Sequence, residues 1–497
     1  ELETVIADDL EAQDLDFKQW ITDSVKDAQA QVVEMAVCMA NGGGGTVVFG
    51  VADKVKNRAR ALLGVPLEVD INRLMKAVYD RTDPKITPYF EELLIPEGTG
   101  RLLVMQVQGG LAPYTDTQGG GKIRVGKDCQ PLTGSLRNQV WVETGESDFT
   151  AVAVQEPWTE ALSATALETL RETARREQAP QDLLRLSDLD LLQALEVVRD
   201  GRLTRAALFL AGREAVIRRH FPHYTWTFAR MRSATDYADR QDGYDALATA
   251  LGQLMQRTMM DNPLQTLTMG LFHHEYRIYP EIALREGLLN ALCHQDFRMP
   301  GPVVVAQYPD RLEISNAGGF IGGISPDNIL HHRPAPRNPM LVNALVRLRL
   351  VNRLNLGVRR MVEAMLIEGK EPPRWANQGE AVRVTLRRQE ISAPFRGFVT
   401  EEGQAGRVLG IDHLLVVRYL LDHPEIDTTA AARQCQRPEE EAREVLNDME
   451  TRLGYLERGG GLRRGAFWTL RADLHTRLAG DGHAERDQRI DWETAKT

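Results

Sequence analysis

The feature that most constrains the fold is a helix-length amphipathic stretch that ends in a run of glycines and leads directly into an apolar segment. Apolar side chains recur at helical spacing over residues 21–40, which is the pattern of a helix with one buried face. Asn41 and the four glycines after it provide the backbone freedom that ends a helix, and residues 46–51 then form an apolar run of strand length. A helix joined so tightly to a strand predicts a mixed α/β domain.

Three carboxylates lie near the ends of this helix and strand. Glu11 and Asp16 precede the helix, and Asp53 follows the strand. Alternation along residues 14–18 places Asp16 and Lys18 on the same face of a short strand. Because Glu11 and Asp16 are five residues apart, their carboxylates converge only if the chain bends between them.

Carboxylate oxygens are the ligands that Mg²⁺ and Mn²⁺ prefer, and these ions promote phosphodiester cleavage by activating water and neutralising charge. The pattern therefore predicts a catalytic metal site of the nuclease type, held by Glu11, Asp16 and Asp53. Lys18 would serve there as a phosphate contact or as a charge partner of Asp16. Spacing alone leaves the alternative that these are ordinary surface acids of an acidic protein.

The order of these residues resembles the Schlafen/AlbA-type domain. The resemblance rests on the two acids, the Phe-Lys pair, the Asn-Gly-Gly after the helix and the later Asp53, and it continues through residues 101–107 and 122–126. It implies nucleic-acid binding and, at the positions of Glu11, Asp16 and Asp53, the metal-dependent endoribonuclease site of nucleolytic Schlafens. In one departure, Asp16 is a methylene shorter than the Glu that is usual in the family.

Basic residues cluster beside the third carboxylate. They fall in two sets, one directly after Asp53 and one further along: Lys54, Lys56, Arg58 and Arg60, then Lys122, Arg124 and Lys127. Cations beside a carboxylate site suit a phosphate backbone, because they hold the strand while a metal neutralises the reacting phosphate. The alternative is a solvated hairpin tip, where lysines are common.

Composition bounds the rest of the interpretation. With 497 residues, 43% of them hydrophobic, the chain has room for about three domains. Lys and Arg total 60 against 70 Asp and Glu, so nucleic acid must bind at a local basic patch. No apolar run approaches the ~20 residues of a membrane span, and no basic-then-apolar signal begins the sequence. The four cysteines lack C-x-x-C spacing, so we expect no zinc site, no disulfide framework and a reducing cytoplasm.

The middle of the chain begins with a predicted helical connector over residues 154–200, which are polar and helical in pattern. Residues 205–212 are typical of a buried helix or strand, and residues 220–228 of a strand. Local pattern alone does not separate helix from strand in such short apolar runs.

The clearest motif of this region lies within residues 281–297. Glu286, Asn290 and His294 recur every four residues and therefore share one helical face. This E-x-x-x-N-x-x-x-H helix resembles the N-box of GHKL-type ATPases, and the likeness covers roughly residues 260–390. The resemblance implies a nucleotide site at five positions: Glu286, Asn290, Asn316, Gly318 and Gly357.

Two departures argue against ATP hydrolysis. Asn316 stands where working GHKL enzymes contact adenine through an aspartate, and the Gly-x-Gly phosphate loop has Asn355 in place of its first glycine. That change adds a Cβ where the backbone should approach phosphate closely. We therefore expect a degenerate ATPase fold that dimerises or senses a ligand, ahead of a working ATPase or a nucleotide-driven switch at Glu286 and Asn290.

The carboxy-terminal segment 411–470 has the pattern of a helix, a short helix, a longer helix and a hairpin, with residues 459–461 as the hairpin turn. That order resembles a winged helix-turn-helix. Its third helix opens with three glutamates at 439–441, which would repel DNA phosphates, so we expect protein association from this module. After Arg471 the polar sequence predicts a mobile tail.

We therefore expect a multidomain α/β (α+β) protein with these domains: Schlafen/AlbA-type 1–150, helical connector and start of the middle domain 151–259, degenerate GHKL-like 260–392, winged helix 408–472 and polar tail 473–497. Our hypothesis is a prokaryotic, cytoplasmic, homo-oligomeric endoribonuclease, expected as a dimer, that uses Mg²⁺ or Mn²⁺ on structured RNA such as tRNA in stress or phage defence. The alternative is a non-catalytic DNA-binding transcriptional regulator whose ATPase-like domain senses a ligand or dimerises.

Overall fold

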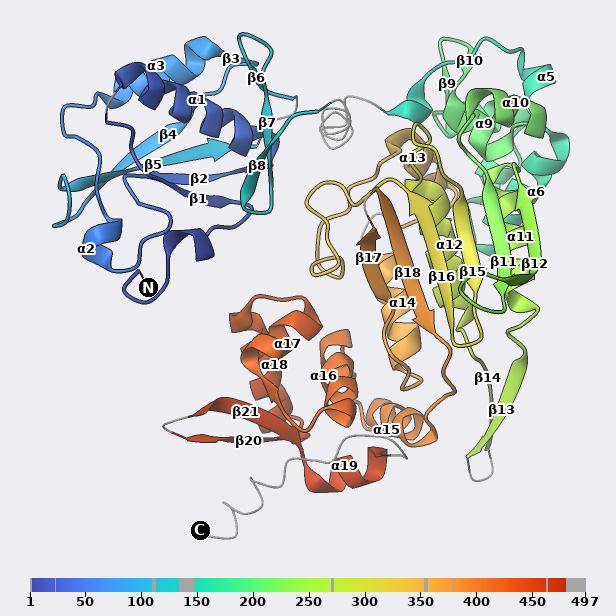
Figure 1. The fold of residues 1–497 in the computed structure, drawn as a ribbon. Coiled ribbons are helices and arrows are strands. Elements are labelled where there is room, and N and C mark those ends of the chain that lie inside the picture. Colours follow the sequence, from blue (N-terminus) through green and yellow to red (C-terminus); the bar gives the residue numbers. More distant parts are fainter. Residues whose placement is uncertain are drawn as a thin grey trace. The chain divides into compact units, whose positions relative to one another are not determined.

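In the computed structural model the chain forms two compact units (Figure 1). The structure describes residues 2–22, 24–109, 113–133, 148–269, 272–352, 356–378, 380–461 and 464–479. The first unit extends to Asp148, and the second takes in nearly all of the rest. Within these described ranges, no helix is long and apolar enough to cross a membrane.

The first unit is built on a four-stranded sheet. The strand order is β1-β2-β5-β4, in which β1 runs parallel to β2 and the other neighbours are antiparallel. The strands are β1 (Leu15–Lys18), β2 (Gly44–Phe49), β4 (Tyr89–Leu94) and β5 (Arg101–Gln108). Helix α1 (Val25–Asn41) covers one face of the sheet, and its buried side chains share a core with β2 and β5. The predicted helix and strand are both present.

Capping and glycine explain the two ends of α1. The helix begins at Val25 rather than at residue 21, because the Ser24 hydroxyl caps it by accepting a hydrogen bond from the Asp27 N–H at 3.2 Å. After the helix, Gly43 and Gly44 adopt φ of 98° and 96°. A Cβ at Gly44 would lie 2.6 Å from the backbone nitrogen of Gly109, so only glycine permits this close approach of two chain segments.

Short elements complete the first unit. They are η1 (Ala7–Asp9), α2 (Arg58–Ala61), α3 (Ile71–Arg81), β3 (Thr82–Asp83), β6 (Thr115–Asp116), β7 (Lys122–Val125) and β8 (Asp128–Pro131). Strand β3 pairs with β6, and β7 forms an antiparallel hairpin with β8. This hairpin packs against α1.

The cysteine prediction is wrong for one pair. Cys38 of α1 and Cys129 of β8 form a disulfide, with Cα atoms 6.0 Å apart. The two cysteines are 91 residues apart, so their spacing gave no sign that α1 and the β7–β8 hairpin pack together. Cys293 and Cys435 are free and buried.

The second unit contains a six-stranded sheet in the order β12-β11-β15-β16-β18-β17. Its strands are β11 (Trp226–Met231), β12 (Tyr237–Gly243), β15 (Val303–Gln307), β16 (Arg311–Ala317), β17 (Arg374–Gln378) and β18 (Ala381–Arg387). Strand β11 runs parallel to β15, and the other neighbours are antiparallel. Three helices pack together against this sheet: α11 (Leu247–Met259), α12 (Glu281–His294) and α14 (Leu356–Leu366). The predicted mixed α+β fold class is confirmed.

A helical region precedes this sheet in the chain and shares one continuous hydrophobic core with it. Its elements are η2 (Phe149–Ala151), α5 (Trp158–Ala161), α6 (Ala164–Arg176), α7 (Gln181–Leu184), α8 (Asp188–Ala194), β9 (Val198–Arg199), β10 (Arg202–Leu203), α9 (Arg205–Ala211) and α10 (Glu214–His220). Three further elements lie beyond β12: β13 (Leu264–Met269), β14 (Phe272–Arg277) and α13 (Pro339–Arg347).

The prediction of a single strand over residues 220–228 is wrong, because only residues 226–228 belong to a strand. Helix α10 ends at His220, and β11 begins only at Trp226. Between them, Phe221 and Tyr224 are buried against the ring of Phe209, with centroids 5.5 and 4.8 Å away. Their apolar side chains therefore fill an aromatic cluster instead of a sheet face.

The carboxy-terminal part of the second unit is mostly helical. Its elements are α15 (Ala393–Gln404), α16 (Ile411–Asp422), β19 (Ile426–Asp427), α17 (Thr428–Cys435), α18 (Glu439–Thr451), β20 (Leu456–Gly461), β21 (Arg464–Leu470) and α19 (Ala472–Leu478). Strand β21 pairs with both β19 and β20. The assignment of these elements to a winged helix-turn-helix stays a prediction.

Two expectations for this part are wrong. The glycines at 459–461 belong to strand β20 and are not the hairpin turn, since β20 extends to Gly461 beside β21. The chain after Arg471 continues as helix α19, because Leu474 and Leu478 are buried in the local core. Residues 480–497 of the predicted tail lie outside the described residues.

Candidate functional site

Asp16 is the centre of a buried charge cluster in the first unit. It lies on β1 and is fully buried, whereas its neighbours Leu15 and Phe17 are only half-buried. The guanidinium of Arg124 donates to one carboxylate oxygen, and the Lys18 ammonium lies 2.5 Å from the other. Asp16 and Lys18 thus share a face, as the alternation predicts. A buried carboxylate is tolerable here because two cations compensate its charge.

Glu11 reaches the cluster from the turn that precedes β1. Its carboxylate accepts a hydrogen bond from the Phe17 N–H at 3.3 Å and lies 3.7 Å from the Lys18 ammonium. The bend that convergence with Asp16 requires is therefore present. Burial, and secondly the negative charge of Asp16, raises the pKa of Glu11 to about 6.

Arg124 comes from β7, 108 residues after Asp16. Its side chain is 1% exposed, and it also donates to the carbonyls of Ala12 and Leu15, both at 3.0 Å. The predicted contact of Arg124 with a nucleic acid needs correction, because its guanidinium is enclosed by the domain and already bonded. Its place is that of the buried charge partner of Asp16.

Asp53 follows β2 and lies within electrostatic reach of Lys18 and Asp16. Burial is the main cause that raises the pKa of this carboxyl, and its Oδ1 is buried without a hydrogen-bond partner. The fold thus brings the three predicted carboxylates into one neighbourhood. Asp16 and Glu11 both form ion pairs with Lys18 and Arg124, and the contacts of Asp16 are the shorter ones.

The predicted basic residues divide into paired and unpaired cations. Besides Arg124, three form ion pairs: Arg58 with Glu97 at 2.7 Å, Lys122 with Glu34 at 2.6 Å, and Lys127 with Asp8 at 2.6 Å. Three others are exposed and, among the residues that the structure describes, have no ion-pair partner: Lys54, Lys56 and Arg60. Because an unpaired cation gives up no protein contact to bind phosphate, the segment after Asp53 is the candidate interface.

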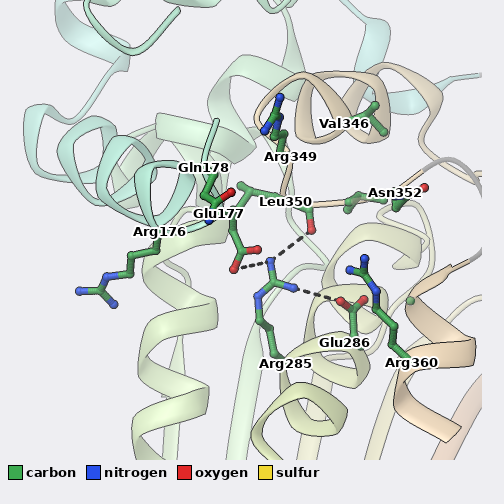
Figure 2. A pocket seen from close by; sticks show the side chains of 12 residues that line it. Arg176, Glu177, Gln178, Arg285, Glu286, Val346, Arg349, Leu350, Asn352 and Arg360 are labelled. Carbon is green, nitrogen blue, oxygen red and sulfur yellow. Dashed lines mark hydrogen bonds and ion pairs between the residues drawn. The ribbon is translucent and has the colours of Figure 1, made fainter. Parts of the chain in front are cut away.

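The second unit holds a cavity of about 560 Å³ beside Glu286 (Figure 2). It is lined by the end of α6, by α12, by the segment after α13 and by the start of α14. Glu286 is buried and ion-paired with Arg285 at 3.0 Å, and burial raises the pKa of its carboxyl. A Cβ at Gly357 would lie 2.5 Å from Glu286 Oε2, so glycine leaves room for this carboxylate.

Three of the predicted nucleotide contacts do not line this cavity: Asn290, Asn316 and Gly318. Asn316 is buried and donates to the carbonyl of Ala317 at 3.0 Å. Gly318 packs against Arg337, to whose guanidinium carbon a Cβ would approach within 3.0 Å. Asn355 lies outside the described residues.

Comparisons with known proteins agree with this division of the chain. A family model described as "Schlafen, AlbA_2" matches residues 11–133. The amino-terminal unit carries a Schlafen/AlbA_2 domain. A model described as "Putative ATP-dependent DNA helicase recG C-terminal", of the HATPase type, matches residues 301–386, and "Domain of unknown function (DUF8451)" matches residues 140–227. The predicted combination of an AlbA-type domain with an ATPase-like domain is confirmed.

One similar solved structure is that of the DIP2311 protein from Corynebacterium diphtheriae. It is 24% identical, with a TM-score of 0.57, over 94% of this chain and 93% of that chain. At this identity the likeness concerns the fold. No curated protein matches the chain.

The carboxylates of the Schlafen/AlbA_2 domain, as arranged, do not fit a divalent cation. No group of three or more Asp, Glu, His or Cys side chains in the described parts of the chain is placed to hold a metal ion. The reason is local, since Arg124 and Lys18 engage both oxygens of Asp16. Beside Asp16, the Oδ1 of Asp53 is buried without a hydrogen-bond partner, and a cation there would satisfy it.

Sequence reasoning missed two features of these sites. The first is the burial of Arg124, because alternation with the apolar Ile123 predicts a polar, exposed face for Arg124 in β7 and gave no sign of its burial. The second is the set of arginines around the cavity beside Glu286. They come from four separate segments, so no local pattern reveals them.

Proposed function

We propose that the Schlafen/AlbA_2 domain binds nucleic acid through the phosphate backbone and does not cleave it. The observation that carries this proposal is the set of unpaired, exposed cations Lys54, Lys56 and Arg60 on one short segment. The net charge of the chain is −10, so such a local patch has to supply the attraction. The match to the Schlafen/AlbA_2 model supports nucleic acid as the partner.

The surroundings of Asp16 are the reason that we expect no cleavage. A carboxylate that is fully buried and shared between two cations has no free lone pair directed at solvent. Arg124 and Lys18 supply the positive charge that a metal ion would otherwise bring to Asp16. The cluster therefore stabilises β1, which pairs with β2, the strand that precedes the basic segment. We place binding on the exposed residues of that segment.

The test measures binding of a fluorescent tRNA, a single-stranded DNA and a duplex DNA by anisotropy over a range of salt concentrations. The variant Lys54→Gln/Lys56→Gln/Arg60→Gln should bind at least tenfold more weakly. Its log–log salt slope should fall by about 2, since each phosphate contact contributes roughly 0.7–0.9 to the slope.

The matched control removes three cations at the other end of the unit, on α3 and just after it (Figure 1): Arg73→Gln/Lys76→Gln/Lys85→Gln. Its affinity and salt slope should equal those of the wild type. Equal losses in both triple variants would show only a dependence on overall charge, and the proposed interface would be abandoned. Comparing the three nucleic acids also decides between RNA and DNA.

A second candidate function, metal-dependent cleavage of structured RNA, is favoured by the unpartnered buried Oδ1 of Asp53. Incubation of tRNA with Mn²⁺ or Mg²⁺, followed by gel analysis, compares the wild type with Glu11→Gln/Asp53→Asn. Cleavage by the wild type alone would establish this function and refute binding without cleavage. Intact RNA in both samples, together with a binding shift, supports the first proposal.

A further inference from the structure

Another cavity of the second unit lies where the six-stranded sheet meets the helical carboxy-terminal part. Its volume is about 320 Å³, at the lower end of the range for small-molecule sites. It is lined by the residues before β17 and the start of that edge strand, by α16 and by the end of α17. The five predicted nucleotide contacts, all within the described residues, lie elsewhere in the unit, so this cavity is separate from the one beside Glu286.

Part of the lining is apolar and aromatic. Leu330, Val362 and Leu415 are buried there and belong to the hydrophobic core of the carboxy-terminal part. Trp375 and Tyr419 add two half-buried aromatic side chains, and Trp375 packs against both hydrophobic cores of the unit. A lining of this kind favours a flat apolar group, because aromatic rings pack on one another in offset or edge-on contacts.

Two parts of the lining are held in place before any ligand arrives. Pro372 and Pro373 precede β17, and each proline ring fixes the backbone φ near −65°. On α16 the rings of Tyr419 and His423 stack with their centroids 3.9 Å apart, which restrains both side chains. A preformed cavity loses little conformational entropy when a ligand binds.

Both carboxylates of the lining are already compensated. Glu371 lies 2.6 Å from the guanidinium of Arg374, and it also accepts a hydrogen bond from Gln389 at 3.1 Å. Asp422 lies 2.8 Å from the guanidinium of Arg418. A cationic ligand would therefore have to displace an arginine before it met a carboxylate.

Arg418 has one donor that the protein leaves unused. Its side chain is only 9% exposed, and its Nε is buried without a hydrogen-bond partner. A buried N–H without an acceptor costs free energy, which an incoming acceptor recovers. Because Arg418 lines the cavity, a ligand there is in position to supply that acceptor.

Arg433 adds a second available guanidinium. It lies in the last turn of α17, is exposed and, within the described ranges, forms no ion pair. The lining thus has three arginines, Arg374, Arg418 and Arg433, against two carboxylates. Guanidinium groups suit carboxylate oxygens, because their planar N–H donors match the two oxygens in geometry and charge.

We propose that this cavity binds a small aromatic carboxylate, with the ring against Trp375 and the carboxylate on Arg418 Nε and Arg433. The carboxylate supplies the acceptor that Arg418 lacks, and it balances the excess of arginine. Inorganic phosphate would meet the arginines but leave the apolar lining unfilled. Because Trp375 packs against both cores, the ligand would also stabilise the junction of the sheet with the helical part. This proposal goes beyond nucleic-acid binding and does not rest on it.

The experiment is calorimetric titration of the full chain with 2-naphthoate as the probe. Two matched probes separate the contacts: 2-naphthamide keeps the flat rings without the charge, and decalin-2-carboxylate keeps the charge without the flat rings. 2-Naphthoate should bind with a submillimolar Kd, and each of the other two at least tenfold more weakly, since each lacks one kind of contact. Equal affinity of either matched probe would overturn the proposed recognition.

Three variants locate the site. Arg433→Gln should lower the affinity for 2-naphthoate at least fivefold, and Arg443→Gln is the matched control, because Arg443 is exposed on α18 but does not line the cavity. Arg418→Lys keeps a positive charge beside Asp422 but lacks the Nε–H, so it should lower the affinity at least tenfold. Trp375→Leu should weaken 2-naphthoate more than decalin-2-carboxylate, since only 2-naphthoate stacks on the indole ring.

Two further results would overturn the proposal. One is no binding at millimolar 2-naphthoate in the wild type, by calorimetry and by ligand-observed NMR. The other is an equal loss in Arg433→Gln and Arg443→Gln, both of which change exposed side chains and should keep the wild-type melting temperature. The nucleic-acid assay concerns the other unit and other residues, so the two proposals fail independently.

Discussion

At the scale of single residues, Asp16 and Arg124 form a buried ion pair on which the stability of the first unit depends. Breaking a buried ion pair on one side leaves a charge without a partner, which typically costs about 3 kcal/mol or more. We expect Arg124→Met to lower the free energy of unfolding by about 3 kcal/mol, measured by urea denaturation, and the addition of Asp16→Asn to restore part of it. Lys127→Met on the same hairpin removes an exposed ion pair, which solvent screens, and should leave the free energy of unfolding close to that of the wild type.

If Arg124→Met and Lys127→Met lowered the free energy of unfolding equally, the burial of the Asp16–Arg124 pair would not increase its contribution to stability. The double variant also separates charge from packing. A full recovery by Asp16→Asn would mean that the uncompensated carboxylate, rather than the lost contacts of the Arg124 side chain, carries the whole effect.

Glu11 makes the stability of this unit depend on pH in a direction opposite to that of most carboxylates. Its pKa is raised from 4.5 to about 6, so the folded protein holds this proton more tightly than the unfolded chain. The free energy of unfolding should therefore fall as the pH rises from about 4.5 to 6. Glu11→Gln should exceed the wild type by about 1–2 kcal/mol at pH 7.5.

That advantage should vanish near pH 4.5, where the wild-type carboxyl is protonated as well. Urea titrations of both proteins at several pH values measure the difference directly. A constant difference across the pH range would mean that the substitution acts through packing and that the pKa of Glu11 is not raised.

At the scale of elements, two adjacent glycines after α1 have the same backbone but different surroundings. Gly43 and Gly44 both have positive φ, yet a Cβ at Gly43 meets nothing within 4 Å, whereas one at Gly44 meets the backbone of Gly109 and Val107. Gly43→Ala should cost about 1 kcal/mol for the left-handed backbone alone. Gly44→Ala should cost at least about 1 kcal/mol more, because backbone atoms of β5 and the residue after it must move.

Urea unfolding of both variants checks this pair, each serving as the control for the other. Equal costs would mean that β2 can shift away from β5 without loss, and that the glycine run serves only to end the helix. The comparison therefore separates the conformational need for glycine from the need for close approach.

The sequence predicted α1, β1 and β2 because periodicity, capping and glycine act within a few residues of one another. From the sequence, Glu11 and Asp16 converge only if the chain bends between them. The structure contains this bend. The Cys38–Cys129 disulfide and the Asp16–Arg124 pair join segments that are 91 and 108 residues apart, so nothing local encodes them. Tertiary packing also overrode pattern where Phe221 and Tyr224 fill an aromatic cluster rather than a strand.

At the scale of the whole molecule, the two units have separate hydrophobic cores, and the first unit carries the proposed nucleic-acid site. Units with separate cores unfold in separate transitions unless their interface couples them. A ligand that binds only the folded form stabilises its own unit by about 2.7 kcal/mol at a concentration 100 times its Kd. We therefore expect two thermal transitions, and nucleic acid should shift only the one that belongs to the first unit.

Hydrogen exchange followed by mass spectrometry assigns each transition, with peptides from β5 reporting on the first unit and peptides from α12 on the second. Nucleic acid should delay exchange in β5 alone. If nucleic acid protected both peptides equally, the two units would be energetically coupled. The second unit would then be a regulator of nucleic-acid binding, because coupling between two sites acts with the same free energy in both directions.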